Sequence, residues 1–172
     1  DQFEELVIKP ILWLFPIFWL NAKEKLPVSS LGITVKNLFP AIYLSLGLGA
    51  VFVIEAVLTN FFKYGQLNFA ANIGDLPILS SLGISFATAA SEETAFRGYI
   101  FGRLWAVLKD EWAANIASSF IWTLVHVPIV FFVWKFNLAA GILYLFLTAV
   151  FGIGSAFIFG RTKNVFGSII LH

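Results

Sequence analysis

The sequence predicts an all-α fold, a polytopic bundle of about six or more transmembrane helices that forms a single domain over residues 1–172. Its 172 residues are 59% hydrophobic and 12% charged, and the mean hydropathy is +0.88. Soluble domains carry roughly 25% charged residues, and a chain this short cannot bury so much apolar surface in one core. A soluble all-α protein with a very apolar core is the alternative.

The first half of the chain contains two apolar runs. Residues 7–20 include Lys9, Pro10 and Pro16, so this run is either a truncated span or a kinked helix that enters the bilayer at an angle. Residues 38–62 form the first run that is long enough to cross about 30 Å of hydrocarbon.

The second half contains three more apolar segments and the beginning of a fourth. Residues 78–108 form a long helical stretch that has charges in its middle, and two further spans cover 112–134 and 136–160. The final VFGSIILH resembles the start of a helix that is cut off at His172. Because the chain contains no methionine, not even at residue 1, we expect it to be incomplete at both ends.

Basic residues in the links indicate the orientation in the membrane. One side receives Lys23, Lys25, Lys36, Lys109, Arg161 and Lys163, and the other receives Lys63 and Lys135. The positive-inside rule places the first set in the cytoplasm. The net charge of only +1 argues against nucleic acid as a partner.

The stretch SEETAFRGYI at 91–100 concentrates three charges in an apolar chain. Glu93 and Arg97 are four residues apart on one helix face, in the order that favours an ion pair. Glu92 lies about 100° away around the helix, so we expect it to be unpaired and available. The three charges form either a structural lock between helices or part of a catalytic site.

The sequence has only two histidines, His126 and His172, and both lie in apolar segments. A glutamate and a histidine can activate water for hydrolysis while a second histidine stabilises the oxyanion. Alternatively, Glu92 and the two imidazoles could hold a zinc ion with an open water position. The absence of cysteine excludes a thiol nucleophile and Cys-zinc sites.

These residues resemble the motifs of the CAAX protease and bacteriocin-processing (CPBP, Abi) family of intramembrane proteases, which includes the Ras-converting CAAX prenyl endopeptidases. The matching positions are Glu92, Glu93, Arg97, Trp122, His126 and His172. The first motif is Glu-Glu-x-x-x-Arg and the second is Phe-x-x-x-His, with Trp122 here in place of the phenylalanine. The third is a histidine followed four positions later by a polar residue, of which only the histidine lies within the chain.

The resemblance implies a role for each position. Glu92 and His126 would position and activate the attacking water, and His172 would stabilise the oxyanion. Glu93 and Arg97 would support the helix geometry, and Trp122 would provide an aromatic wall. The resemblance favours a mechanism that requires no cofactor, with zinc as the alternative.

We therefore expect an intramembrane endopeptidase that cuts a membrane-associated or lipidated, CAAX-like peptide or protein. Its partners would be this substrate and membrane lipid, and its site would open to the cytoplasmic side of a prokaryotic cell membrane. The main alternative is a non-catalytic immunity or scaffold protein that keeps the polar cluster for packing and partner binding. A proton-coupled transporter is disfavoured because the sequence shows no inverted repeat.

Overall fold

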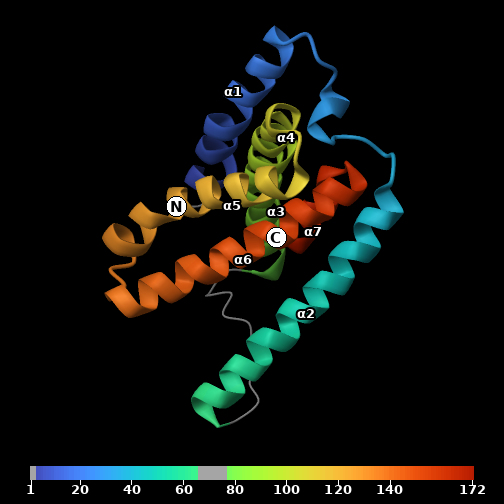
Figure 1. Cartoon of the computed structure of the whole chain (residues 1–172). Helices are drawn as coiled ribbons and strands as arrows, with labels where there is room; N and C mark the ends of the chain where they lie inside the picture. Colours follow the sequence, from blue (N-terminus) through green and yellow to red (C-terminus); the bar gives the residue numbers. More distant parts are fainter. Residues whose placement is uncertain (1–2, 66–76) are drawn as a thin grey trace.

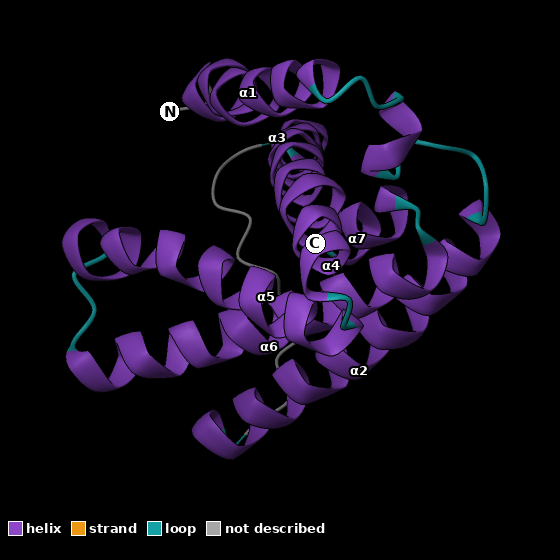
Figure 2. Ribbon diagram, turned by 45° about the horizontal axis from the view of Figure 1, so that its top comes forward, coloured by secondary structure: helices purple, strands orange, loops and turns teal. Residues whose placement is uncertain are grey.

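The computed structural model describes residues 3–65 and 77–172, and the regular elements in these two ranges are all helices (Figures 1 and 2). In chain order they are η1 (Glu4–Ile8), α1 (Lys9–Lys23), η2 (Val28–Leu31), α2 (Leu38–Tyr64), α3 (Ile78–Glu93), η3 (Thr94–Phe101), α4 (Gly102–Leu108), α5 (Glu111–Pro128), η4 (Ile129–Val133), α6 (Leu138–Thr162) and α7 (Val165–Leu171). The predicted all-α fold is confirmed.

Several of these helices are long and apolar enough to cross a membrane. Within the described ranges there are four such segments, Leu6–Lys23, Leu38–Leu58, Glu111–Val133 and Leu138–Thr162. The first of them includes residues 7–20, so this run, together with the residues that flank it, has the length and composition of a span. The prediction of six or more transmembrane helices also counted the charged stretch 78–108 and the last helix. Neither of these is among the four candidate spans, and the four by themselves support a polytopic bundle.

The predicted stretch 78–108 is helical throughout but changes its winding. α3 passes into η3, a π-helical segment, which passes into α4. The helix then ends at Lys109, which adopts the left-handed conformation (φ 59°) and terminates α4. Asp110 then caps α5, because its side chain accepts a hydrogen bond of 2.7 Å from the amide of Ala113.

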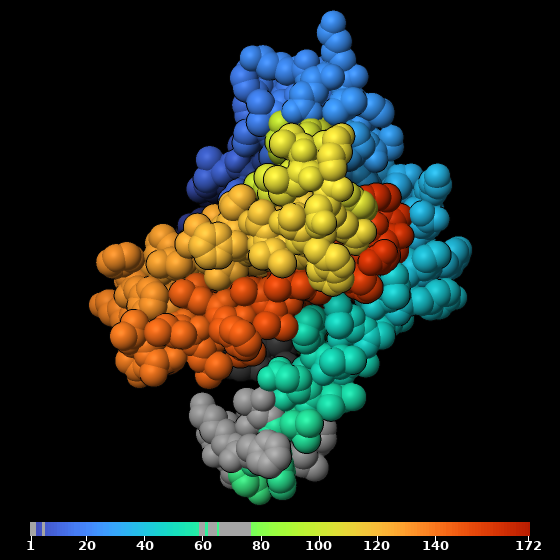
Figure 3. Space-filling model, in the orientation of Figure 1, coloured from blue at the N-terminus to red at the C-terminus, as the bar shows by residue number. Residues whose placement is uncertain are grey.

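The helices pack around the α3–η3 segment, which contacts α1, α5, α6 and α7. α5 and α6 form an antiparallel hairpin, and α7 packs against α2 and α6. In Figure 3, α4, α5 and α6 lie across the front of the molecule, while α1 and α2 lie at opposite edges. The charged stretch of the sequence therefore lies at the centre of the bundle.

Small residues fill much of the interior, and large apolar residues face outwards. Ala95, Ala114 and Ala156 are fully buried, whereas Leu79 is 83% exposed and Phe132 is 78% exposed. Lipid solvates such side chains as well as a protein core does, so helix association depends on close packing of small residues and on interhelical hydrogen bonds. The exposed apolar surface is therefore what a bilayer requires.

Gly98 in η3 allows one particularly close approach. A Cβ atom at this position would lie 2.6 Å from the carbonyl oxygen of Leu31, which is main chain and cannot turn away. Leu31 belongs to η2 and is fully buried. The contact therefore seats the link between α1 and α2 directly on the central segment.

We expect Gly98→Ala to destabilise the protein by about 1–3 kcal/mol, because the methyl group overpacks the contact with Leu31. Gly47→Ala is the matched control, since a Cβ there meets nothing within 4 Å and alanine is favoured over glycine in a helix by about 1 kcal/mol. Reversible unfolding in mixed micelles measures both changes. Equal effects of the two substitutions would contradict the proposed close approach.

Candidate active site

The carboxylate of Glu93 connects four helical elements at the end of α3. Its side chain is 0% exposed, and its Oε2 lies 3.1 Å from Nε of Arg97 in η3. The same oxygen accepts a hydrogen bond of 2.6 Å from the hydroxyl of Ser155 in α6. Its Oε1 lies 2.9 Å from Nδ1 of His172, which follows α7. The predicted pairing of Glu93 with Arg97 is confirmed. Glu93 also contacts His172, which the sequence predicted as a catalytic residue.

The guanidinium of Arg97 is buried between the central segment and the α5–α6 hairpin. Its Nη2 donates a hydrogen bond of 3.3 Å to the carbonyl of Gly152, and its Cζ lies 4.5 Å from the centroid of the Trp122 ring. Nη1 has no hydrogen-bond partner within the described ranges. The indole face therefore provides part of the electrostatic environment of this buried cation.

The prediction that Glu92 is unpaired was wrong. Its Oε1 lies 2.8 Å from Nζ of Lys9 in α1, and its Oε2 accepts a hydrogen bond of 3.1 Å from Nε1 of Trp122 in α5. The side chain of Glu92 is only 8% exposed. A lysine in an apolar helix needs a partner, and α1 packs along α3, so Lys9 reaches this carboxylate.

Trp122 joins Glu92 to the first histidine. Its indole N–H donates to Glu92, and its main-chain carbonyl lies 2.9 Å from Nδ1 of His126 one turn later. Because a carbonyl can only accept, this contact requires a proton on Nδ1, and in the corresponding neutral tautomer Nε2 has a lone pair. The centroids of the Trp122 and His126 rings are 4.7 Å apart.

The second histidine lies against the same indole. The ring centroid of His172 is 6.1 Å from that of Trp122 and 5.7 Å from that of Phe151. Its Nδ1 is occupied by Glu93, so Nε2 is the ring nitrogen left for another group. The structure thus brings His172 to Glu93, whereas the sequence led us to expect it beside Glu92.

Both imidazoles line one pocket of about 610 Å³ between α2, α5 and α6. The lining residues are Phe52, Glu55, Trp122, His126, Tyr144, Phe146, Leu147, Thr148, Val150, Phe151 and His172. The volume has room for several water molecules at about 30 Å³ each. Glu92 is not among the lining residues and is linked to the pocket through Trp122.

A comparison with known protein families identifies the chain. The family described as type II CAAX prenyl endopeptidase Rce1-like matches residues 74–172, which are more than half of the chain. The chain belongs to this family. The matched region contains all six predicted site residues of this Rce1-like protein, and its membership implies a CAAX-type intramembrane protease in general terms. No curated protein and no solved structure has a significant match.

The side chains predicted for zinc do not form a ligand group. Within residues 3–65 and 77–172, no three His, Asp or Glu side chains are arranged to hold a metal ion. Glu92 forms an ion pair with Lys9 and accepts a hydrogen bond from Trp122, while His172 is hydrogen-bonded to Glu93. The residues present therefore do not fit the zinc alternative.

Three polar partners of the predicted residues in this Rce1-like site were themselves not predicted. Lys9 could have been found, because a charge within an apolar run requires a partner. Ser155 and Gly152 gave no such signal, since their contacts with Glu93 and Arg97 arise only when α6 packs against the central segment.

We expect Glu93→Gln to lower the free energy of unfolding by about 3–5 kcal/mol, because Arg97 would keep a buried charge without its counterion. Ser155→Ala removes one hydrogen bond to the same carboxylate and should cost only about 1 kcal/mol. Unfolding in mixed micelles at pH 7 compares the two variants. Similar small losses would show that the ion pair does not hold this part of the bundle together.

Proposed function

We propose that this Rce1-like protein is an endopeptidase that hydrolyses a peptide bond of a lipidated, CAAX-like substrate within the membrane. The observation that supports the proposal is the meeting of Glu92, His126 and His172 around the indole of Trp122, with Glu93 hydrogen-bonded to His172. A hydrogen bond fixes the orientation of each of these side chains, as general acid–base chemistry requires.

In the proposed reaction, His126 and Glu92 act on the attacking water. Nε2 of His126 accepts a hydrogen bond from water in the pocket, which orients the oxygen towards the substrate carbonyl. A carboxylate can accept about four hydrogen bonds, and Lys9 and Trp122 each occupy one oxygen of Glu92. Glu92 therefore has capacity left to receive the proton, although the water must reach it beside the Trp122 indole because Glu92 does not itself line the pocket.

In the same reaction, His172 stabilises the negative charge that develops on the carbonyl oxygen. The donation of its Nδ1–H to Glu93 fixes the ring, and in the imidazolium form of His172 the second proton, on Nε2, is donated to the oxyanion. A donor that is held in place before the reaction can lower the barrier by about 3–4 kcal/mol. Glu93 and Arg97 act as positioning residues.

The surroundings of the histidines suit a substrate that carries an apolar chain. Phe146, Leu147 and Val150 of α6 and Phe52 of α2 line the pocket beside them. The polar links that carry most of the basic residues are hydrogen-bonded to one another, for example Asn164 to the carbonyl of Lys36 at 2.8 Å. The positive-inside rule favours the cytoplasm for this end, and we propose that substrate enters from that side.

Glu92→Gln and His126→Ala test the proposal directly. We expect each variant of the full-length protein to cleave a farnesylated CAAX peptide in proteoliposomes at least 100-fold more slowly, because each loses a group that activates water. Glu111→Gln, which makes the same change at the start of α5, is the control. Undiminished cleavage by both variants would refute these catalytic roles, whereas no cleavage by the unsubstituted protein would favour the scaffold or immunity alternative.

Trp122→Phe tests the link between Glu92 and the pocket. The ring keeps its place against Arg97 and His126, but the hydrogen bond to Glu92 is lost. We expect kcat to fall about tenfold with little change in KM, since one neutral donor to a charged acceptor contributes about 1.5–3 kcal/mol. Trp112→Phe on the exposed face of α5 is the matched control. An unchanged kcat would mean that Trp122 serves only as a wall.

A further inference from the structure

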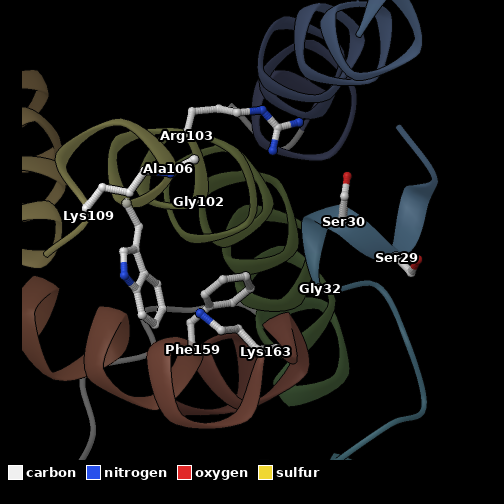
Figure 4. Close-up of a pocket in the computed structure, with 10 residues that line it drawn as sticks. Ser29, Ser30, Gly32, Gly102, Arg103, Ala106, Lys109, Phe159 and Lys163 are labelled. Atoms are coloured by element: carbon white, nitrogen blue, oxygen red, sulfur yellow. The ribbon is translucent and has the colours of Figure 1, made fainter. Parts of the chain in front are cut away.

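A second pocket, of about 530 Å³, lies at the end of the bundle where the basic links gather (Figure 4). It is formed by η2, α4 and the end of α6, and its lining includes Ser29, Arg103, Trp105, Lys109 and Lys163. It shares no lining residue with the pocket of the two histidines. A ligand here would therefore not compete directly with the substrate.

The lining of this second pocket contains three cations and no carboxylate. Arg103 is already paired, because its Nη2 lies 2.6 Å from Glu24 and 2.9 Å from Asn21. Figure 4 shows it turned towards α1, away from the other two cations. The charge available to a ligand therefore comes from Lys109 and Lys163.

The two lysines differ in their surroundings. Nζ of Lys163 lies 3.1 Å from the centroid of the Trp105 ring, which holds the ammonium beside the pocket. Burial lowers the pKa of Lys163, while the nearby carboxylate of Glu111 opposes this shift. Glu111 itself contacts Arg161 at 3.6 Å. Lys109 makes no side-chain hydrogen bond or ion pair with the described residues, so the positive charge of this wall is only partly compensated.

Hydroxyl groups lie on the opposite wall. Ser29 and Ser30 of η2 lie across the pocket from Lys109 in Figure 4. Ser30 donates to Asn21 at 2.8 Å, whereas the hydroxyl of Ser29 has no such bond within the described ranges. Two ammonium groups and a hydroxyl on the lining of one pocket form a donor set without a carboxylate, which is suited to an anion with several oxygens.

We propose that this pocket binds a phosphate group, with Lys109 and Lys163 neutralising its charge and Ser29 donating a hydrogen bond. The location favours a phosphate at the membrane surface, since the pocket lies where the candidate spans Leu6–Lys23 and Leu138–Thr162 end. Basic pockets between transmembrane helices at this level bind anionic headgroups. The same donors also suit a soluble phosphate, and the proposal does not depend on the proposed protease activity.

Calorimetric titration of the full-length protein in neutral detergent with dihexanoyl phosphatidate tests this site. We expect saturable binding that weakens about tenfold in Lys109→Gln and in Lys163→Gln, because each variant loses a charged donor to the phosphate. Lys36→Gln is the matched control, since it removes a charge from the same end of the molecule without touching the pocket. It should leave the affinity unchanged.

Two further titrants identify the source of the phosphate. Dihexanoylglycerol lacks the phosphate and should not bind. If millimolar inorganic phosphate competes with phosphatidate, the site exists and its ligand is a soluble phosphate. If phosphatidate binds and inorganic phosphate does not, the site exists and its ligand is a lipid headgroup. Equal weakening by Lys36→Gln, or equal binding of dihexanoylglycerol, would overturn the proposal. Because the side chain of Lys109 makes no hydrogen bond or ion pair with residues 3–65 and 77–172, Lys109→Gln decides the question even if Lys163→Gln does not fold.

Discussion

The burial of the Glu93 carboxylate is the constraint on which the rest of the site depends. A charge at membrane depth costs several kcal/mol unless other groups compensate for it. Arg97, Ser155 and His172 supply that compensation from η3, α6 and the end of α7. Three elements must therefore take fixed positions around α3 before the carboxylate is satisfied. The same contacts that stabilise the bundle also orient one of the two imidazoles.

Close approach of α6 makes these polar contacts possible. A Cβ atom on Gly152 would lie 3.1 Å from the ring of Trp122 and 3.2 Å from Cβ of Ser119, so a larger residue would push α6 away from α5. The carbonyl of Gly152 also accepts from Arg97. In lipid, where apolar side chains gain little by leaving the solvent, such close contacts and buried hydrogen bonds are the main sources of helix association. The glycine therefore affects both the packing and the electrostatics of the site.

The sequence predicted the features that depend on local spacing. The apolar runs predicted the membrane spans, and the four-residue spacing predicted the ion pair between Glu93 and Arg97. It did not predict the partners that depend on how helices cross. His172 and Glu93 are 79 residues apart, and helical periodicity alone cannot show which of two adjacent glutamates a distant side chain will meet. For the same reason Glu92 was expected to be free, although Lys9 reaches it from α1.

The first helix is therefore part of the site, although the family match begins only at residue 74. α1 is bound to the central segment at both of its ends. Lys9 contacts Glu92 at one end, and Glu24, just after the other end, accepts from Tyr99 at 2.6 Å and pairs with Arg103. The hydrogen bond from Tyr99, together with Arg103, holds the pKa of Glu24 below its ordinary value, so this contact is present at neutral pH and weakens as the pH falls. A shift of α1 by one turn, about 5.4 Å, would break both contacts. The contacts at the two ends of α1 therefore fix its position along the central segment and keep the ammonium of Lys9 beside Glu92.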